Sequence, residues 1–146
     1  MLSLEESLKI LKETNALLEG HFILSSGLHS PQYVQCAKLM SKPEKAHKIC
    51  ASLSEKIINE FKDFDLVLSP AIGGIVIGYE IGRLLKKETI FSERVDGKFV
   101  LRRDFFIKKN QRVVVVEDVI TTGKSSLECS NIIQKMGGTI VGYACI

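Results

Sequence analysis

Tryptophan is absent from this sequence, and no hydrophobic run is long enough to cross a bilayer comfortably. The most apolar stretch, 66–81, contains Ser69, Pro70 and Glu80, which favours a buried strand followed by a helix. Neither sign of charge dominates, because the chain has 20 basic and 17 acidic residues and a net charge of +3. So small and dispersed an excess predicts no nucleic-acid partner, and the apolar pattern predicts no membrane contact.

Disulfide, zinc-ligand and export-signal patterns are missing as well. The cysteines form no CxxC pair, and each stands among apolar or small neighbours: Cys36, Cys50, Cys129 and Cys145. The three histidines form no metal-binding pair and no acid–histidine–nucleophile spacing. The N-terminal segment MLSLEESLKILKE carries acids where an export signal needs basic residues. We therefore expect buried free thiols in a cytoplasmic protein.

The residues that are present predict one α/β domain. The chain has 146 residues, of which 45% are hydrophobic and 25% charged. Leucines at helical spacing after Ser3 predict a helix that ends near Gly20, and residues 21–37 predict two short extended runs. Further along, short apolar strands alternate with helices, one of which begins at Pro43. This alternation predicts an open, mainly parallel sheet flanked by helices.

The segment VVVVEDVITTGKS, residues 113–125, carries the strongest chemical signal. A buried strand ends in two carboxylates, Glu117 and Asp118, and a loop of hydroxyl residues and glycine then opens into a helix. The free N–H groups and positive dipole end of that helix suit a phosphate, whereas the two acids suit neutral hydroxyls such as a ribose diol. The segment therefore indicates a sugar phosphate ligand at the carboxyl end of a strand.

Two other interpretations of this segment are weaker. The ending Gly123-Lys124-Ser125 matches a Walker A loop, but that pattern requires glycine where this chain has Asp118. The segment could also be a strand–turn–helix corner in which Asp118 caps a helix. Capping would explain one acid and the glycine, but not the second acid or the cluster of hydroxyl groups.

The segment resembles the phosphoribosyl diphosphate (PRPP) motif of the type I phosphoribosyltransferases. Three further segments are similar to those of the orotate phosphoribosyltransferases within that family: GHFILSSGLHSP (20–31), SPAIGG (69–74) and SERVDGKFVLRR (92–103). The resemblance implies the type I fold in a single domain, 1–146, with an N-terminal helix and hood at 1–40, a core at 41–146 and a mobile β-hairpin. It also implies synthesis of orotidine 5′-monophosphate and pyrophosphate from orotate and PRPP, in the making of UMP.

The resemblance implies roles for the residues of this chain that match the family's motifs. Glu117 and Asp118 would hold the ribose hydroxyls, with Asp118 also catalytic, and the loop after them would cradle the 5′-phosphate. Arg94 joins this PRPP-binding set, which otherwise runs along the motif: Glu117, Asp118, Val119, Ile120, Thr121, Thr122, Gly123, Lys124 and Ser125. The loop after the first core strand would offer its backbone to pyrophosphate: Ala71, Ile72, Gly73 and Gly74.

Basic residues of the hairpin would act on the leaving group. Arg94, together with Lys98, Arg102 and Arg103, would neutralise the departing pyrophosphate, and Thr121 and Ser25 would lie near orotate. The family also implies Mg²⁺, held mainly through PRPP and water with no protein ligand, and a homodimer in which the 93–104 loop is shared across the interface. A lid of this kind would keep water from the reacting sugar.

The resemblance leaves two points open. Members of the family continue past the last strand, where the next turn supplies an arginine for the orotate carboxylate, so we expect this chain to be truncated at its C-terminal end. A transferase for another base and a non-catalytic PRPP-binding regulator remain the alternative functions. The segment 20–31 argues against another base, and the basic hairpin argues against a regulator.

Overall fold

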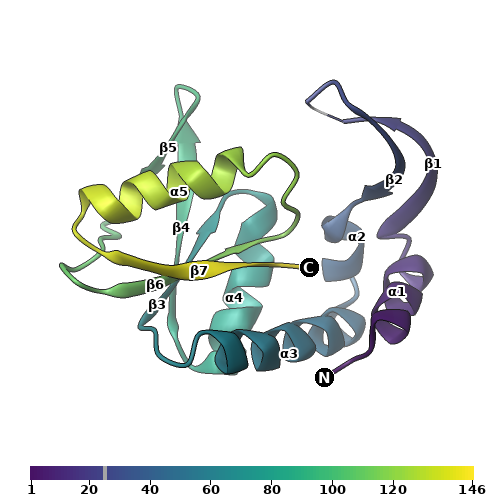
Figure 1. Cartoon of the computed structure of the whole chain (residues 1–146), viewed down its shortest axis with the longest axis horizontal. Coiled ribbons are helices and arrows are strands. Elements are labelled where there is room, and N and C mark those ends of the chain that lie inside the picture. The colour runs from purple at the N-terminus through teal and green to yellow at the C-terminus, as the bar shows by residue number, and fades with distance from the viewer. Residues whose placement is uncertain (25) are drawn as a thin grey trace.

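A five-stranded sheet forms the centre of the computed structural model, which describes residues 1–24 and 26–146 (Figure 1). Its order is β5-β4-β3-β6-β7, with β3 at Leu66–Pro70, β4 at Glu88–Val95, β5 at Lys98–Leu101, β6 at Arg112–Glu117 and β7 at Thr139–Cys145. β3 runs parallel to β4 and β6, β6 runs parallel to β7, and only the β4–β5 pair is antiparallel. The predicted open, mainly parallel sheet is confirmed.

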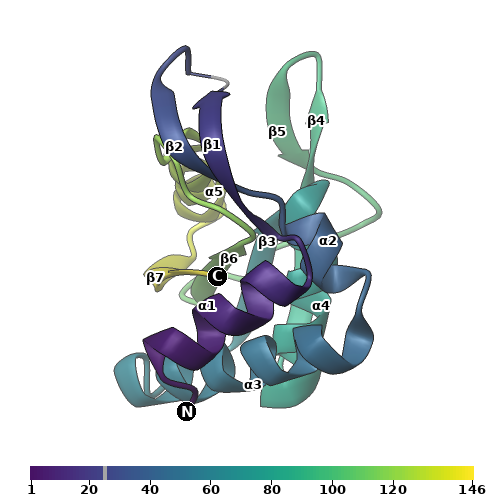
Figure 2. The same cartoon turned by 90° about the vertical axis from the view of Figure 1, so that its right-hand side faces the viewer.

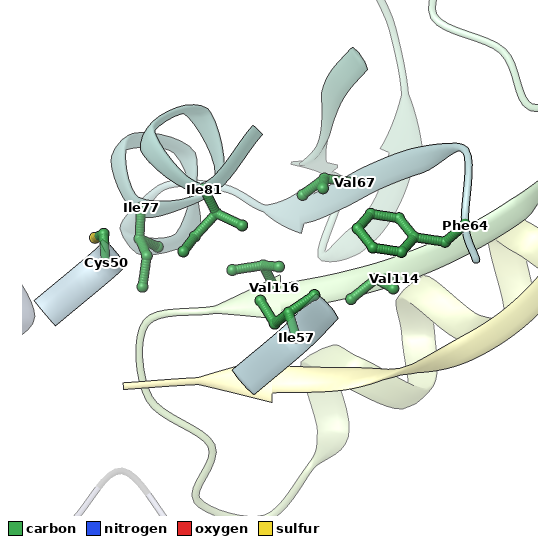
Figure 3. Close-up of a cluster of buried hydrophobic side chains, with 8 residues drawn as sticks. All are labelled: Cys50, Ile57, Phe64, Val67, Ile77, Ile81, Val114 and Val116. Carbon is green, nitrogen blue, oxygen red and sulfur yellow. The ribbon is translucent and has the colours of Figure 1, made fainter. Parts of the chain in front are cut away.

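Helices cover both faces of this sheet. α3 (Pro43–Glu60) and α4 (Gly73–Leu85) pack on one face, and α5 (Lys124–Lys135) packs on the other. Alternate residues of each inner strand face opposite layers, so β3 and β6 are buried on both sides. Figure 3 shows the cluster beneath α3 and α4, which is built from Cys50, Ile57, Phe64, Val67, Ile77, Ile81, Val114 and Val116.

The N-terminal forty residues form α1 (Leu4–Glu13), the hairpin strands β1 (Leu17–Ile23) and β2 (His29–Val34), and α2 (Cys36–Met40). Ser3 and Glu6 form a capping box that starts α1, as the sequence predicts. The predicted end near Gly20 is wrong, because Asn15 adopts a left-handed φ of 54° and fully buried Ala16 leads into β1. Leu18 continues the helical spacing of the leucines in α1, but it belongs to strand β1.

Two hairpins project from the same end of the molecule, as Figures 1 and 2 show. One is β1–β2, which we call the hood, and the other is β4–β5. The β4–β5 turn places Asp96 at φ 50° and Gly97 at φ 77°, the left-handed pair that a two-residue hairpin turn requires. Asp96 and Gly97 therefore form the tight turn between β4 and β5.

All four cysteines are free thiols, as expected, although only three of them are buried. Burial raises the pKa of Cys36 and of Cys50 to about 12, so both stay protonated and unreactive at neutral pH. Cys145, on edge strand β7, is only partly covered.

None of the helices in the part of the chain that the structure describes has the length and hydrophobicity needed to span a membrane.

The core predicts a matched pair of stability effects. Ile81 on α4 is fully buried, whereas the side chain of Ile58 on α3 is 51% exposed. We expect Ile81→Ala to lower the free energy of unfolding by about 2–5 kcal/mol, because it removes buried methyl groups and leaves a cavity. The same change at Ile58 should cost less than about 0.5 kcal/mol. Urea unfolding of both variants measures the difference, and equal losses would contradict the described packing.

Candidate active site

Two loops meet where the neighbouring strands β3 and β6 end. The chain passes from β3 outward to β4 and later returns to the other side of β3 as β6, so the strand order reverses between them. In open α/β sheets such a reversal opens a crevice at the carboxyl ends of the strands. Residues 71–74 follow β3, and residues 118–123 follow β6. The pyrophosphate loop and the PRPP motif predicted from the sequence are therefore adjacent.

Gly73, where the first loop enters α4, and Asp118, in the second loop, are in direct contact. A Cβ atom added at Gly73 would collide with the carboxylate of Asp118, so the acid lies against the bare backbone at the start of α4. Gly74 is also tight, since its added Cβ would lie 3.4 Å from the carbonyl oxygen of Val116. The peptide bond between Ala71 and Ile72 is cis. A side chain at position 73 would force the Asp118 carboxylate out of its present place.

Both loops lead into helices whose N-cap residues provide no side-chain cap. In the described part of the chain the first N–H of α5, that of Lys124, makes only a long bond of 3.4 Å to the Thr122 hydroxyl oxygen. Ile72 occupies the cap position of α4, and Gly123, with φ 76°, occupies that of α5. Uncapped N–H groups at the positive end of a helix dipole form a site for an anion. Asp118 caps neither helix, so the capping interpretation fails, and the structure presents two anion sites with the acid pair between them.

A pocket of about 210 Å³ lies at the start of α5, and we call it the cradle. Most of the predicted PRPP-binding residues line it, together with the arginine of the hairpin: Arg94, Glu117, Val119, Ile120, Thr121, Thr122, Gly123, Lys124 and Ser125. Thr121, Thr122 and Lys124 are exposed, so their polar groups are available to a ligand. The motif therefore folds into one concave surface, as its loop-to-helix pattern predicts.

Glu117 is the more deeply buried of the two acids, with 6% of its surface exposed. The hydroxyl of Ser126, on the first turn of α5, donates a hydrogen bond to Glu117 Oε1. Burial raises the pKa of Glu117, and the nearby Asp118 acts in the same direction, whereas the bond from Ser126 opposes the increase. The hydrogen bond from Ser126 therefore favours the charged form of Glu117 against the effect of burial.

A second pocket, of about 470 Å³, lies between the hood and the motif. Phe22 and Tyr33 of the hood stack with ring centroids 5.6 Å apart on its wall, and Asp118 and Thr121 face it from the other side. Thr121 lines both pockets, which agrees with its predicted position between phosphate and base. The other predicted base contact, Ser25, lies outside the residues that the structure describes.

The hairpin brings Arg94 to the cradle of its own chain. Arg94 Nη1 donates to the Gly97 carbonyl oxygen over 2.8 Å and to Glu128 Oε2 over 3.0 Å, and its guanidinium lies 4.0 Å from the centre of the Phe99 ring. These contacts hold the cation beside the predicted phosphate site.

The remaining hairpin cations lie elsewhere. Lys98 and Arg102 are exposed and line neither pocket. Arg103 is paired with Glu93 over 2.8 Å, and this bond lowers the pKa of the Glu93 carboxyl. The roles of all four cations at pyrophosphate stay predictions.

Sequence reasoning missed three contacts near the site. The Ser126 hydroxyl follows the motif directly, and its place on the first helical turn was the available signal. Glu128 meets Arg94 only because the hairpin folds over α5, so no local pattern reveals it. His21 Nε2 and His29 Nδ1 lie 2.6 Å apart across the hood, a pair that strand pairing creates.

Among the described residues, no group of three or more histidine, cysteine or acidic side chains could hold a metal ion.

Comparisons with known proteins agree with this geometry. Residues 41–146 match the family model described as the phosphoribosyl transferase domain. The chain is 48% identical to orotate phosphoribosyltransferase of Carboxydothermus hydrogenoformans over 94% of its own length and 72% of that protein.

Solved structures show the same fold. Orotate phosphoribosyltransferase of Aeropyrum pernix superimposes with a TM-score of 0.79 at 26% identity, covering 94% of this chain and 78% of that one. UMP synthase of Leishmania donovani gives a TM-score of 0.81 at 22% identity, and the match covers 97% of this chain but 30% of the larger protein. The fold, the motif and the identity to a curated relative together place the chain in the orotate phosphoribosyltransferase family.

Proposed function

We propose that this protein transfers the phosphoribosyl group of PRPP to orotate and forms orotidine 5′-monophosphate and pyrophosphate. The observation that carries the proposal is the acid pair Glu117–Asp118, which lies between the uncapped N-termini of α4 and α5. PRPP has a matching order of groups, with a phosphate at one end, a diphosphate at the other and a neutral diol between them. The family membership and the named relative support the same activity.

The proposed reaction needs positioning more than covalent chemistry. The bond from the ribose C1′ to the diphosphate oxygen breaks, with its electron pair leaving on the diphosphate, and a bond from C1′ to a ring nitrogen of orotate forms while the proton of that nitrogen is released to water. Positive charge develops on the sugar as the first bond breaks. The start of α5 holds the 5′-phosphate, the two acids accept the ribose hydroxyls, and the loop 71–74 offers backbone N–H groups to the diphosphate. Orotate would occupy the pocket beneath the hood, next to Thr121.

We propose Mg²⁺ as the cofactor, held by diphosphate oxygens and water. The site fits an ion that arrives with its substrate, because Mg²⁺ retains waters and binds substrate phosphates more readily than dedicated protein cages. Bound in this way, the ion would offset charge on the leaving diphosphate. We also propose a cytoplasmic location, supported by the free thiols of the four cysteines.

An assay with orotate, PRPP and Mg²⁺ tests this function. We expect formation of orotidine 5′-monophosphate by the wild-type protein and a fall of at least about a hundredfold in kcat/KM for Asp118→Asn, because the neutral amide accepts the ribose hydroxyls poorly. Turnover of adenine or xanthine in place of orotate would overturn the choice of base. PRPP binding without turnover of any base would favour the regulator.

Replacing Arg94 should have a separate kinetic effect. If its cation acts on the departing group, Arg94→Ala should lower kcat by about 10²–10³-fold with a smaller change in KM for PRPP, because that charge develops late in the reaction. The matched control is Arg112→Ala, which breaks an exposed ion pair with Asp63 at the opposite end of β6. An increase in KM alone would assign Arg94 to the 5′-phosphate, whose proposed site, the cradle, it lines.

We further propose a homodimer in which the 93–104 hairpin is shared across the interface. Supporting this, exposed apolar side chains run along α4 from the pyrophosphate loop: Ile72 at 86%, Val76 at 53% and Tyr79 at 66% exposure. Val76 and Tyr79 border a groove of about 690 Å³. Within this hairpin, the exposed Lys98 and Arg102, which line neither pocket of their own chain, would reach the neighbouring site.

A charge on α4 tests the proposed interface. We expect Tyr79→Glu to convert the dimer to a monomer in light scattering, because it would bury an unpaired carboxylate. The control is Leu127→Glu on α5, where the native side chain is 63% exposed on the other side of the sheet. A wild-type monomer, or an unchanged dimer for Tyr79→Glu, would contradict this interface.

A further inference from the structure

Ser126 lies outside the predicted motif, yet it makes the hydrogen bond to the buried acid of the site. Its hydroxyl donates to Glu117 Oε1, and both residues are 6% exposed. Ser126 is the third residue of α5, whose first residues, Lys124 and Ser125, line the cradle. The bond therefore ties the acid at the end of β6 to the helix turn that would hold the phosphate.

This hydrogen bond fixes the distance between the Glu117 carboxylate and the cradle, which must both bind one ligand. The 5′-phosphate and the ribose hydroxyls belong to one small molecule of limited reach, so an error in the distance between cradle and acid would weaken both contacts. Glu117 ends a strand buried on both sides, and Ser126 belongs to a helix packed on that strand. The hydroxyl holds the carboxylate in one orientation toward the cradle.

The charges around Glu117 make this donor more important. Asp118 adjoins it in sequence, Cys145 pairs with it from β7, and Cys129 faces it from α5. Arg94 and Lys124 line the same cradle. Burial and Asp118 raise the pKa of Glu117, while donation from Ser126 lowers it. A hydroxyl that donates to a carboxylate stabilises the ionised form, which is the form that accepts ribose hydroxyls.

We infer that Ser126 is a positioning residue for PRPP, because it orients Glu117 toward the ribose diol at a set distance from the cradle. This inference rests on the proposed function, since it takes Glu117 as the acceptor of the ribose hydroxyls. Ser126 itself touches no reacting atom in this arrangement and acts through Glu117.

The chain offers a closely matched control one turn along the same helix. Ser130 is also 6% exposed, and its hydroxyl donates to the Ser126 carbonyl oxygen over 2.9 Å and lies 2.5 Å from the Tyr143 hydroxyl. Ser130→Ala removes the same atom as Ser126→Ala, from an equally buried position of the same helix. It leaves the bond to Glu117 in place, so any general effect of losing a buried hydroxyl on α5 is measured separately.

The experiment compares both variants with the wild type in orotidine 5′-monophosphate synthesis. We expect Ser126→Ala to raise KM for PRPP by about 10- to 100-fold, with a smaller change in kcat, because a hydrogen bond to a charged group is lost. Ser130→Ala should stay within about twofold of the wild type. Inhibition by pyrophosphate, which uses the loop 71–74, should be unchanged in both variants.

The pH profile adds a readout that a purely structural role would not change. Without the Ser126 donor the pKa of Glu117 rises further, so the acidic limb of kcat/KM for PRPP should move to higher pH. Ser126→Thr, which keeps a hydroxyl, should restore the wild-type profile. In a Glu117→Gln background, Ser126→Ala should have little further effect, because both changes act on one interaction.

The outcomes separate this inference from the proposed function. A wild-type protein that makes no orotidine 5′-monophosphate would overturn the function. An active wild type in which Ser126→Ala and Ser130→Ala behave alike, or in which Ser126→Ala weakens pyrophosphate inhibition equally, would overturn the positioning role alone. Additive effects of Ser126→Ala and Glu117→Gln would also overturn it.

Discussion

The parallel pairing of β3 with β6 is the constraint on which the site depends. The register sets Leu66 opposite Val113 and Leu68 opposite Val115, so both strands end at the same edge of the sheet. Each strand is followed by a loop that opens a helix, and the two loops touch where Asp118 lies against Gly73. A change of strand register would separate the acids from the pyrophosphate loop, although every residue of both motifs would remain.

The electrostatics of the site follow from this placement. Two helix N-termini direct positive ends toward one crevice, and neither receives a side-chain cap. The acids between them would repel an uninterrupted polyphosphate but can accept hydrogen bonds from a sugar. The arrangement suits the proposed ligand, which has separated anions and a neutral centre, better than the nucleoside triphosphate that the Walker A ending at Gly123-Lys124-Ser125 would suggest.

The two hairpins surround that crevice with different chemistry. The hood contributes an aromatic and aliphatic wall, including Phe22 and Tyr33, while the β4–β5 hairpin brings a cation, Arg94, to the cradle. Arg94 is held there by Glu128 of α5 and by Phe99 of its own hairpin. An apolar wall suits a flat base, and a cation suits phosphate groups, so each hairpin matches a different part of the proposed substrate pair.

Much of the fold and the cradle could be predicted from the sequence because their signals are local. Apolar runs such as Val113–Val116 indicate buried strands, and the Asp96-Gly97 pair indicates a turn. The order of acids, hydroxyl residues and glycine in 117–125 indicates a ligand-binding loop. The end of α1 could not be predicted, because Leu18 continues the helical spacing. The helix ends earlier because Asn15 adopts a left-handed φ and Ala16 is buried against α2 and α3.

The sequence by itself therefore determined which groups the protein brings to its ligand, since residue type and spacing along one loop are sufficient for that. Only the tertiary structure decided which groups meet. The contact of Asp118 with Gly73, the hydrogen bond from Ser126 to Glu117 and the pairing of Arg94 with Glu128 all arise from packing between elements. Such contacts depend on strand order and on how α5 lies across the sheet, and no local sequence pattern encodes either one.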